Sequence, residues 1–198
     1  MNRWRMVYSL AALVLLAGCS HSESTQGTQE YLLSVSRSVP AIQNASPQTG
    51  AIQLLAIQLP DYLDGNQMII VSPQGQVYRS RQHLWAEPLA SQLRRLTQTR
   101  LAERLPQINW FVAGKDQPRA QLQIECTQFM TDTQGNVHIS GYWQLLSSHH
   151  ERQSRHAFQI SAPLAHSGYL AMSQTLSQSW LKIVDKMAQI LAHSSVMN

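Results

Sequence analysis

The pattern of hydrophobic and polar positions divides this chain into strands, a helix, further strands and a second helix. Its clearest part is an apolar–polar alternation on both sides of a turn at 133–136. A two-residue period is typical of strands that are buried on one face only, so the pattern predicts a β-hairpin. Its apolar positions are Leu122, Ile124 and Cys126 before the turn and Val137, Ile139, Gly141, Trp143 and Leu145 after it.

Two other segments have the three- to four-residue period of an amphipathic helix. The first opens at Glu87-Pro88, where proline suits the first turn, and ends before Pro106. The second is about 24 residues long, and its apolar stripe is Tyr169, Met172, Leu176, Trp180, Ile183, Met187 and Ile190. Short apolar runs predict further strands at 31–35, 52–59, 68–71, 77–79, 108–112 and 156–161.

This order of elements predicts a single α+β domain over residues 30–193. We expect a mixed or largely antiparallel sheet with two helices packed on one face. The longer helix spans about 36 Å, enough to cover four or five strands. The apolar faces of sheet and helix should meet in one core. That core is predicted to contain Leu122, Ile124, Trp143, Leu176, Trp180 and Ile183.

The first 18 residues have the features of a bacterial export signal. Arg3 and Arg5 precede a short apolar run, which ends in Leu16-Ala17-Gly18-Cys19. The run is shorter than the about 20 residues of a membrane-spanning helix, although an uncleaved anchor is the alternative. The ending resembles the lipobox of bacterial lipoproteins. That resemblance implies cleavage before Cys19, a diacylglyceryl group on its thiol and an acyl chain such as palmitate on its new amine.

Residues 19–29 then comprise the lipidated cysteine and a flexible polar tether. Ten residues reach about 35 Å when fully extended, so the domain stays close to the membrane that holds Cys19. An Asp after the cysteine would resemble the inner-membrane retention signal of enteric bacteria, but Ser20 stands there. We therefore expect an outer-membrane location, with the domain facing the periplasm.

Composition and charge narrow the class of protein further. Without Arg3 and Arg5, 13 basic residues face 11 acidic ones, a formal charge of +2. This leaves no basic excess for nucleic-acid binding. The 24 glutamines provide polarity with little charge. Once Cys19 is lipidated, Cys126 has no partner for an intramolecular disulfide, and we expect it to be buried as a small hydrophobic side chain.

Candidate chemistry in the sequence is sparse, and we expect no catalytic, cofactor or metal site. Ser179 and Lys182 match the S-x-x-K nucleophile motif, but they lie within the long predicted helix. The segment from Asp61 to Asn66 lacks the ligand spacing of a calcium loop. Four histidines lie close together around one predicted turn without the spacing of a zinc site; they are His138, His149, His150 and His156.

Three stretches resemble the PqiC/YmbA-like family of ABC-type transport auxiliary lipoproteins, and the resemblance extends from the lipobox to about residue 192. The stretches are Leu59-Pro60-Asp61-Tyr62-Leu63-Asp64-Gly65-Asn66, Leu84-Trp85-Ala86-Glu87-Pro88-Leu89 and Ile139-Ser140-Gly141-Tyr142-Trp143-Gln144-Leu145. The resemblance implies a non-catalytic auxiliary subunit of an MCE-type system that moves lipids between the inner and outer membranes and supports envelope integrity. An MCE-domain membrane protein would then be its partner.

Other functions remain open on the residues alone. A lipid-anchored cell-wall enzyme or assembly factor would share the same anchor. A direct lipid carrier would need an apolar cavity that holds acyl chains. Self-association into a homo-oligomer is also open.

One segment is a candidate partner-binding site: Pro60, Asp61, Tyr62 and Leu63. Tyr62 and Leu63 are apolar residues among turn formers, and aromatic side chains are enriched at binding hot spots. The alternative is that both fold back and close the bottom of the sheet.

Overall fold

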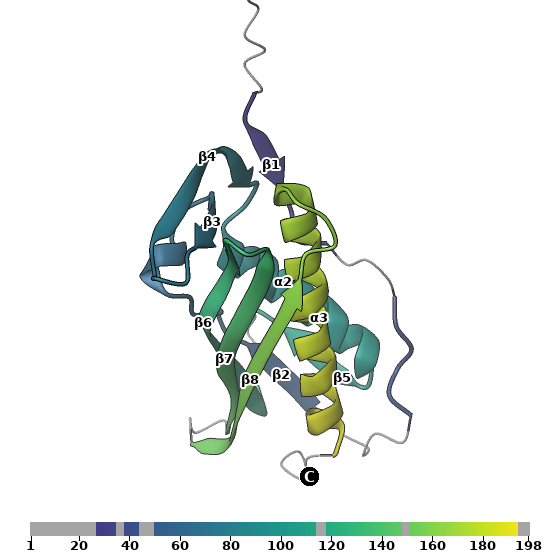
Figure 1. The fold of residues 1–198 in the computed structure, drawn as a ribbon. Coiled ribbons are helices and arrows are strands. Elements are labelled where there is room, and N and C mark those ends of the chain that lie inside the picture. The colour runs from purple at the N-terminus through teal and green to yellow at the C-terminus, as the bar shows by residue number, and fades with distance from the viewer. Residues whose placement is uncertain (1–26, 35–37, 44–49, 114–117, 148–150, 194–198) are drawn as a thin grey trace, which may run out of the picture.

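The protein is described by a computed structural model that covers residues 27–34, 38–43, 50–113, 118–147 and 151–193 (Figure 1). The described elements follow the predicted order of strands, helix, strands and helix. The strands are β1 (Gln29–Tyr31), β2 (Gly50–Leu54), β3 (Gln67–Val71), β4 (Val77–Trp85), β5 (Ile108–Phe111), β6 (Ala120–Asp132), β7 (Asn136–Ser147) and β8 (Arg152–Pro163). The helices are the short 3-10 helix η1 (Asp61–Leu63) and the α-helices α2 (Leu89–Arg104) and α3 (Tyr169–His193).

One mixed sheet contains all eight described strands. Its order is β1-β4-β3-β6-β2-β5, and β7 and β8 extend it from β6 as an antiparallel meander. The long strand β6 pairs in parallel with β2 near residue 120 and with β3 near residue 131. The α+β class and the mixed sheet are therefore confirmed.

The two α-helices pack against each other and cover the sheet from one side (Figure 1). Helix α3 contacts β6, β7 and β8, whereas α2 contacts β5. All six predicted core residues are buried, with Trp180 fully inaccessible to solvent. The predicted core is thus confirmed.

Trp180 joins the two helices to the sheet. Its indole Nε1 donates a 3.0 Å hydrogen bond to Thr97 Oγ1 on α2, and that hydroxyl donates to the Leu93 carbonyl at 2.8 Å. Phe129 and Phe158 meet its ring edge to face, at centroid distances of 6.3 and 5.9 Å. Because the buried N–H has an acceptor, the core gains a large aromatic side chain without an unpaired polar group.

The first strand lies earlier than predicted. It ends at Tyr31 because the following backbone N–H groups bond to helix side chains instead of a neighbouring strand. The Leu33 N–H donates to Gln92 Oε1 at 2.7 Å, and the Ser34 N–H donates to Ser177 Oγ at 3.1 Å. Residues 32–34 therefore connect the sheet to α2 and α3.

The predicted lengths of two further strands, 52–59 and 77–79, were also wrong. Strand β4 continues to Trp85 because it pairs with β3 and also with β1. Strand β2 stops at Leu54, and only a bridge between Gln58 and Glu125 continues its pairing with β6. The predicted loop after Pro60 contains the single turn of η1.

Gly141 lies where strands β6, β7 and β8 are most crowded. The β6–β7 register is irregular between Cys126 and Gln128, opposite this glycine. A Cβ at position 141 would lie 2.7 Å from Phe158 Cζ and 2.9 Å from Cys126 Cα, and closer still to the Glu125 carbonyl oxygen. Only glycine fits this position.

Candidate functional site

The predicted partner-binding segment forms a turn that is half inside the core. Leu63 is only 7% exposed and belongs to the core cluster, while Tyr62 is partly buried against it. Asp61 is exposed, and Pro60 is partly exposed. The turn is closed by hydrogen bonds from the Leu63 and Asp64 N–H groups to the carbonyls of Pro60 and Asp61, at 2.9 and 3.0 Å.

Two hollows flank this turn. One, of about 370 Å³, lies against the irregular part of β6, and the other, of about 210 Å³, lies against the start of α2. Leu59 and Pro60 line both hollows. The turn therefore lies between two concave surfaces, with Asp61 as its exposed charge. A partner-binding role for the segment stays a prediction.

Burial governs the titration of the two groups beneath the turn. It raises the pKa of the Tyr62 hydroxyl, against the opposing effect of a hydrogen bond from the Phe129 backbone. It also raises the pKa of the Cys126 thiol to about 12, against the opposing effect of a hydrogen bond from the Gln128 backbone. Cys126 is buried and free, as predicted. A buried thiol that stays protonated is a poor nucleophile.

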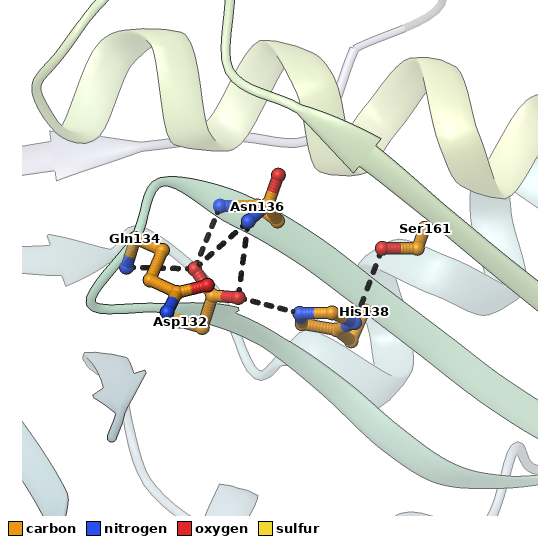
Figure 2. Close-up of polar contacts among 5 residues, drawn as sticks. All are labelled: Asp132, Gln134, Asn136, His138 and Ser161. Atoms are coloured by element: carbon orange, nitrogen blue, oxygen red, sulfur yellow. Dashed lines mark hydrogen bonds and ion pairs between the residues drawn. The ribbon is translucent and has the colours of Figure 1, made fainter. Parts of the chain in front are cut away.

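A polar cluster lies at the turn between β6 and β7. Figure 2 shows the Asp132 carboxylate held on one side by the turn and on the other by a histidine. Its Oδ1 accepts from the backbone N–H groups of Gln134 and Asn136, at 2.9 and 2.8 Å. A 2.8 Å hydrogen bond joins its Oδ2 to His138 Nε2, and a 3.2 Å hydrogen bond joins His138 Nδ1 to Ser161 Oγ.

These hydrogen bonds set the charge of Asp132. Burial alone would raise the pKa of its carboxyl group, but the bonds from His138, Asn136 and Gln134 outweigh it and lower the pKa to about 2. Asp132 is therefore ionised throughout the physiological range. Its carboxylate acts as the cap of a four-residue turn, at which Gly135 has a φ of 82°.

The order Asp132, His138, Ser161 resembles the relay of a serine hydrolase, but the surroundings do not fit that chemistry. Such a relay needs donors for an oxyanion and a bound carbonyl within about 3 Å of the nucleophile. Ser161 is exposed on β8, and the turn amides are directed at the carboxylate. The cluster thus fixes the β6–β7–β8 register.

The sequence analysis missed this cluster, because it grouped His138 with histidines around a single turn. His138 and His156 lie on β7 and β8, and His156 stacks on Trp143 at a centroid distance of 4.3 Å. His149 and His150 lie outside the described residues. The available signal was Asp132 directly before the predicted turn and a histidine just after it.

The other motifs do not assemble a reactive centre in the part of the chain that the structure describes. Ser179 is buried in α3, whereas Lys182 is exposed. No group of three or more His, Cys, Asp or Glu side chains among the described residues could hold a metal ion. Neither described α-helix is long and apolar enough to cross a membrane. Cys19, the predicted lipidation site, lies outside the described residues.

The class of protein that this fold defines is a single α+β domain with a mixed sheet and two α-helices, in which the described polar cluster holds a turn. Comparison with known families specifies that class. The protein family described as "ABC-type transport auxiliary lipoprotein component" matches this chain over residues 31–188. The chain therefore belongs to this family.

Individual relatives agree with the family. The chain is 28% identical to "Intermembrane transport lipoprotein PqiC" of Escherichia coli (strain K12), over 96% of this chain and 97% of that protein. The protein of the same name from Shigella flexneri gives the same values. A crystal structure of an uncharacterised protein has a TM-score of 0.69 at 24% identity, covering 82% of this chain and 97% of the other. One from Xanthomonas campestris has a TM-score of 0.72 at 14% identity, covering 83% and 95%. At these identities both crystal structures support the fold alone.

Proposed function

We propose that this chain is a lipoprotein anchored in the outer membrane that serves, facing the periplasm, as a non-catalytic auxiliary subunit of an MCE-type lipid transport system. The observation that carries the proposal is the nearly full-length similarity to an intermembrane transport lipoprotein. The lipobox ending at Cys19 supports the anchor, and Ser20 supports the outer membrane.

The position of the first strand supports a docking role close to the membrane. Residue 29 opens β1, so about ten residues separate the folded domain from Cys19, a reach of at most about 35 Å. The partner in this proposal is an MCE-domain membrane protein of the same system. The turn from Pro60 to Leu63 is its proposed contact, and self-association of the lipoprotein would multiply such contacts around the partner.

The test is recovery of the partner from cells that carry a tagged chain. After mild cross-linking and separation of the two membranes, we expect an MCE-domain protein to purify with the lipoprotein from the outer-membrane fraction. The mass of the cross-linked species reports any homo-oligomer. Recovery of cell-wall enzymes instead, without an MCE-domain protein, would contradict the proposal.

Two variants test separately the lipidation of Cys19 and the membrane in which the lipoprotein is finally placed. Cys19→Ser should abolish metabolic fatty-acid labelling and outer-membrane placement. Ser20→Asp is the matched control, because it keeps the lipidated cysteine and should retain the protein in the inner membrane. Unchanged fatty-acid labelling of Cys19→Ser would refute lipidation at this residue.

A further inference from the structure

A groove of about 510 Å³ opens between the β3–β4 hairpin, the β6–β7 turn and the first turn of α3. The start of α3, which borders the groove, lies at the end of the molecule where β1 enters the sheet (Figure 1). Ligand pockets typically measure about 300–1,000 Å³ and are mainly apolar with a few polar groups. The groove fits this description, because its walls are formed largely by Ile70, Tyr78, Leu164, Tyr169 and Met172.

The walls of this groove are held in place by contacts outside it. The Leu164 N–H donates to the Gly135 carbonyl at 2.8 Å, which fixes the loop after β8 to the β6–β7 turn. The Tyr169 ring stacks on His83 at a centroid distance of 4.0 Å, and a 2.9 Å hydrogen bond joins His83 Nδ1 to the Tyr31 hydroxyl. A groove with fixed walls costs a ligand little reorganisation.

One buried polar atom in the groove lacks a partner. Thr131 lines the groove and is only 2% exposed, and its Oγ1 has no hydrogen-bond partner among the described residues. A buried hydroxyl without a partner is unfavourable. An acceptor or donor oxygen of a bound molecule would satisfy it.

The rim of the groove has one site that attracts an anion and one that attracts a cation. Gly168 and Tyr169 belong to the start of the 25-residue helix α3, where free N–H groups and the helix dipole attract an anion. The ionised Asp132 lies on the same rim and attracts a cation. A zwitterionic head group matches this pair better than a fatty-acid carboxylate or a purely anionic head group.

We propose that the groove binds one acyl chain of a zwitterionic phospholipid of the phosphatidylethanolamine class. Its phosphate faces the start of α3, its ammonium group faces Asp132, and an ester or phosphate oxygen bonds to Thr131 Oγ1. The source of the lipid rests on the proposed function, since an anchor at Cys19 keeps this end of the domain near a membrane. Exposed apolar side chains beside the groove suit that surface; Val77 is 41%, Tyr78 47% and Leu170 60% exposed.

Photo-cross-linking with the mature lipoprotein in vesicles of phosphatidylethanolamine and phosphatidylglycerol tests the proposal. A diazirine is placed near the end of an acyl chain of one phospholipid or of the other, or on a free fatty acid, in three separate arms. We expect labelling of Met172 and Ile70 in the phosphatidylethanolamine arm. Equal labelling by phosphatidylglycerol or by the fatty acid would overturn the head-group assignment. Labels confined to Val77 and Leu170 would show surface contact only and would overturn the groove.

A matched pair of variants asks whether the groove itself is needed. Leu164→Trp fills it and should abolish labelling of Met172, whereas Leu32→Trp adds the same side chain at an exposed position outside the lining and should leave labelling unchanged. Full labelling of Leu164→Trp would refute the proposal. Loss of MCE-partner recovery in Leu164→Trp, with no lipid label in the unaltered protein, would assign the groove to the partner instead.

Thr131→Val tests the hydroxyl without a change of shape. We expect labelling to fall about three- to tenfold, the effect of one lost hydrogen bond. The thermal midpoint should not fall, since the hydroxyl has no partner among the residues that the structure describes. This variant also keeps the test decisive if Leu164→Trp fails to fold. Unchanged labelling of Thr131→Val would refute the proposed contact. Partner recovery is a separate assay, so failure of the groove and failure of the transport role are distinguishable.

Discussion

The hydrogen bond between Trp180 and Thr97 gives the sharpest test of how the two helices are joined. Thr97→Val removes the acceptor and leaves the indole N–H buried, because Trp180 and Thr97 are both fully inaccessible. A buried donor without a partner costs about 1–3 kcal/mol. For a domain of this size, each 1 kcal/mol lowers the thermal midpoint by about 2–4 °C.

A double-mutant cycle isolates the bond from packing. In a Trp180→Phe background the N–H is absent, so Thr97→Val should cost about 1 kcal/mol less than it does in the unaltered protein. Urea unfolding followed by far-ultraviolet circular dichroism measures each free energy of unfolding without relying on tryptophan fluorescence. Thr99→Val is the matched control, since Thr99 lies on the same helix but is exposed, and it should stay within about 0.5 kcal/mol of the unaltered protein.

Two results would refute this reasoning. If Thr97→Val costs no more than Thr99→Val, the hydroxyl is not an essential acceptor. If Thr97→Val costs the same in both backgrounds, its effect comes from packing on α2 and not from the indole. Trp180→Ala should in either case cost about 3–5 kcal/mol, a large part of the about 5–15 kcal/mol that stabilises a typical domain.

The remaining predictions concern the sheet, the polar turn and the proposed contact. Gly141→Ala should cost about 1–3 kcal/mol through overpacking against β6 and β8, and an unchanged urea midpoint would contradict the crowding. The folded-state pKa of Asp132 is about 2, below the about 3.9 of an unfolded chain. Its stabilisation is therefore complete above the unfolded value and disappears as the pH falls towards 2. Asp132→Asn should flatten the loss of stability over that range in acid titrations of unfolding, and parallel curves would refute the effect. Leu63→Ala should cost about 2–5 kcal/mol, whereas Asp61→Arg should keep the thermal midpoint and weaken partner recovery; wild-type recovery would exclude Asp61 from the contact.

The sequence predicted the fold class and the core well because both depend on periodicity within one segment. The alternation around 133–136 fixed the hairpin, and the helical stripe placed Trp180 on the buried face of α3. The errors lie where backbone partners come from distant segments. No local pattern shows that the Leu33 N–H bonds to Gln92, or that β4 pairs with β1 as well as with β3.

Sites were less predictable than the core for the same reason. The groove is formed by residues from β3, β4, the β6–β7 turn and α3, which are brought together by the parallel pairing of β3 with β6. Strand β4, helix α2 and strand β5 lie between β3 and β6 in the sequence, and no motif indicates that these two strands pair. Tyr62 and Leu63 were difficult to assign for a different reason. Apolar residues in a turn can either contact a partner or fold back into the core, and the sequence does not distinguish the two. The structure places Leu63 in the core, so the surface left for a partner is the exposed side of the same turn.

Several polar side chains that could be reactive have structural positions in the described part of this domain. Cys126 is buried and protonated and Ser179 is buried within α3, while Asp132, which the sequence analysis did not single out, caps a turn. Thr131 is as deeply buried as Cys126 and Ser179, but its hydroxyl has no partner among the described residues. In our proposal this hydroxyl is the point at which the apolar groove meets a polar group of its ligand, and a binding role of that kind suits an auxiliary component of a transport system.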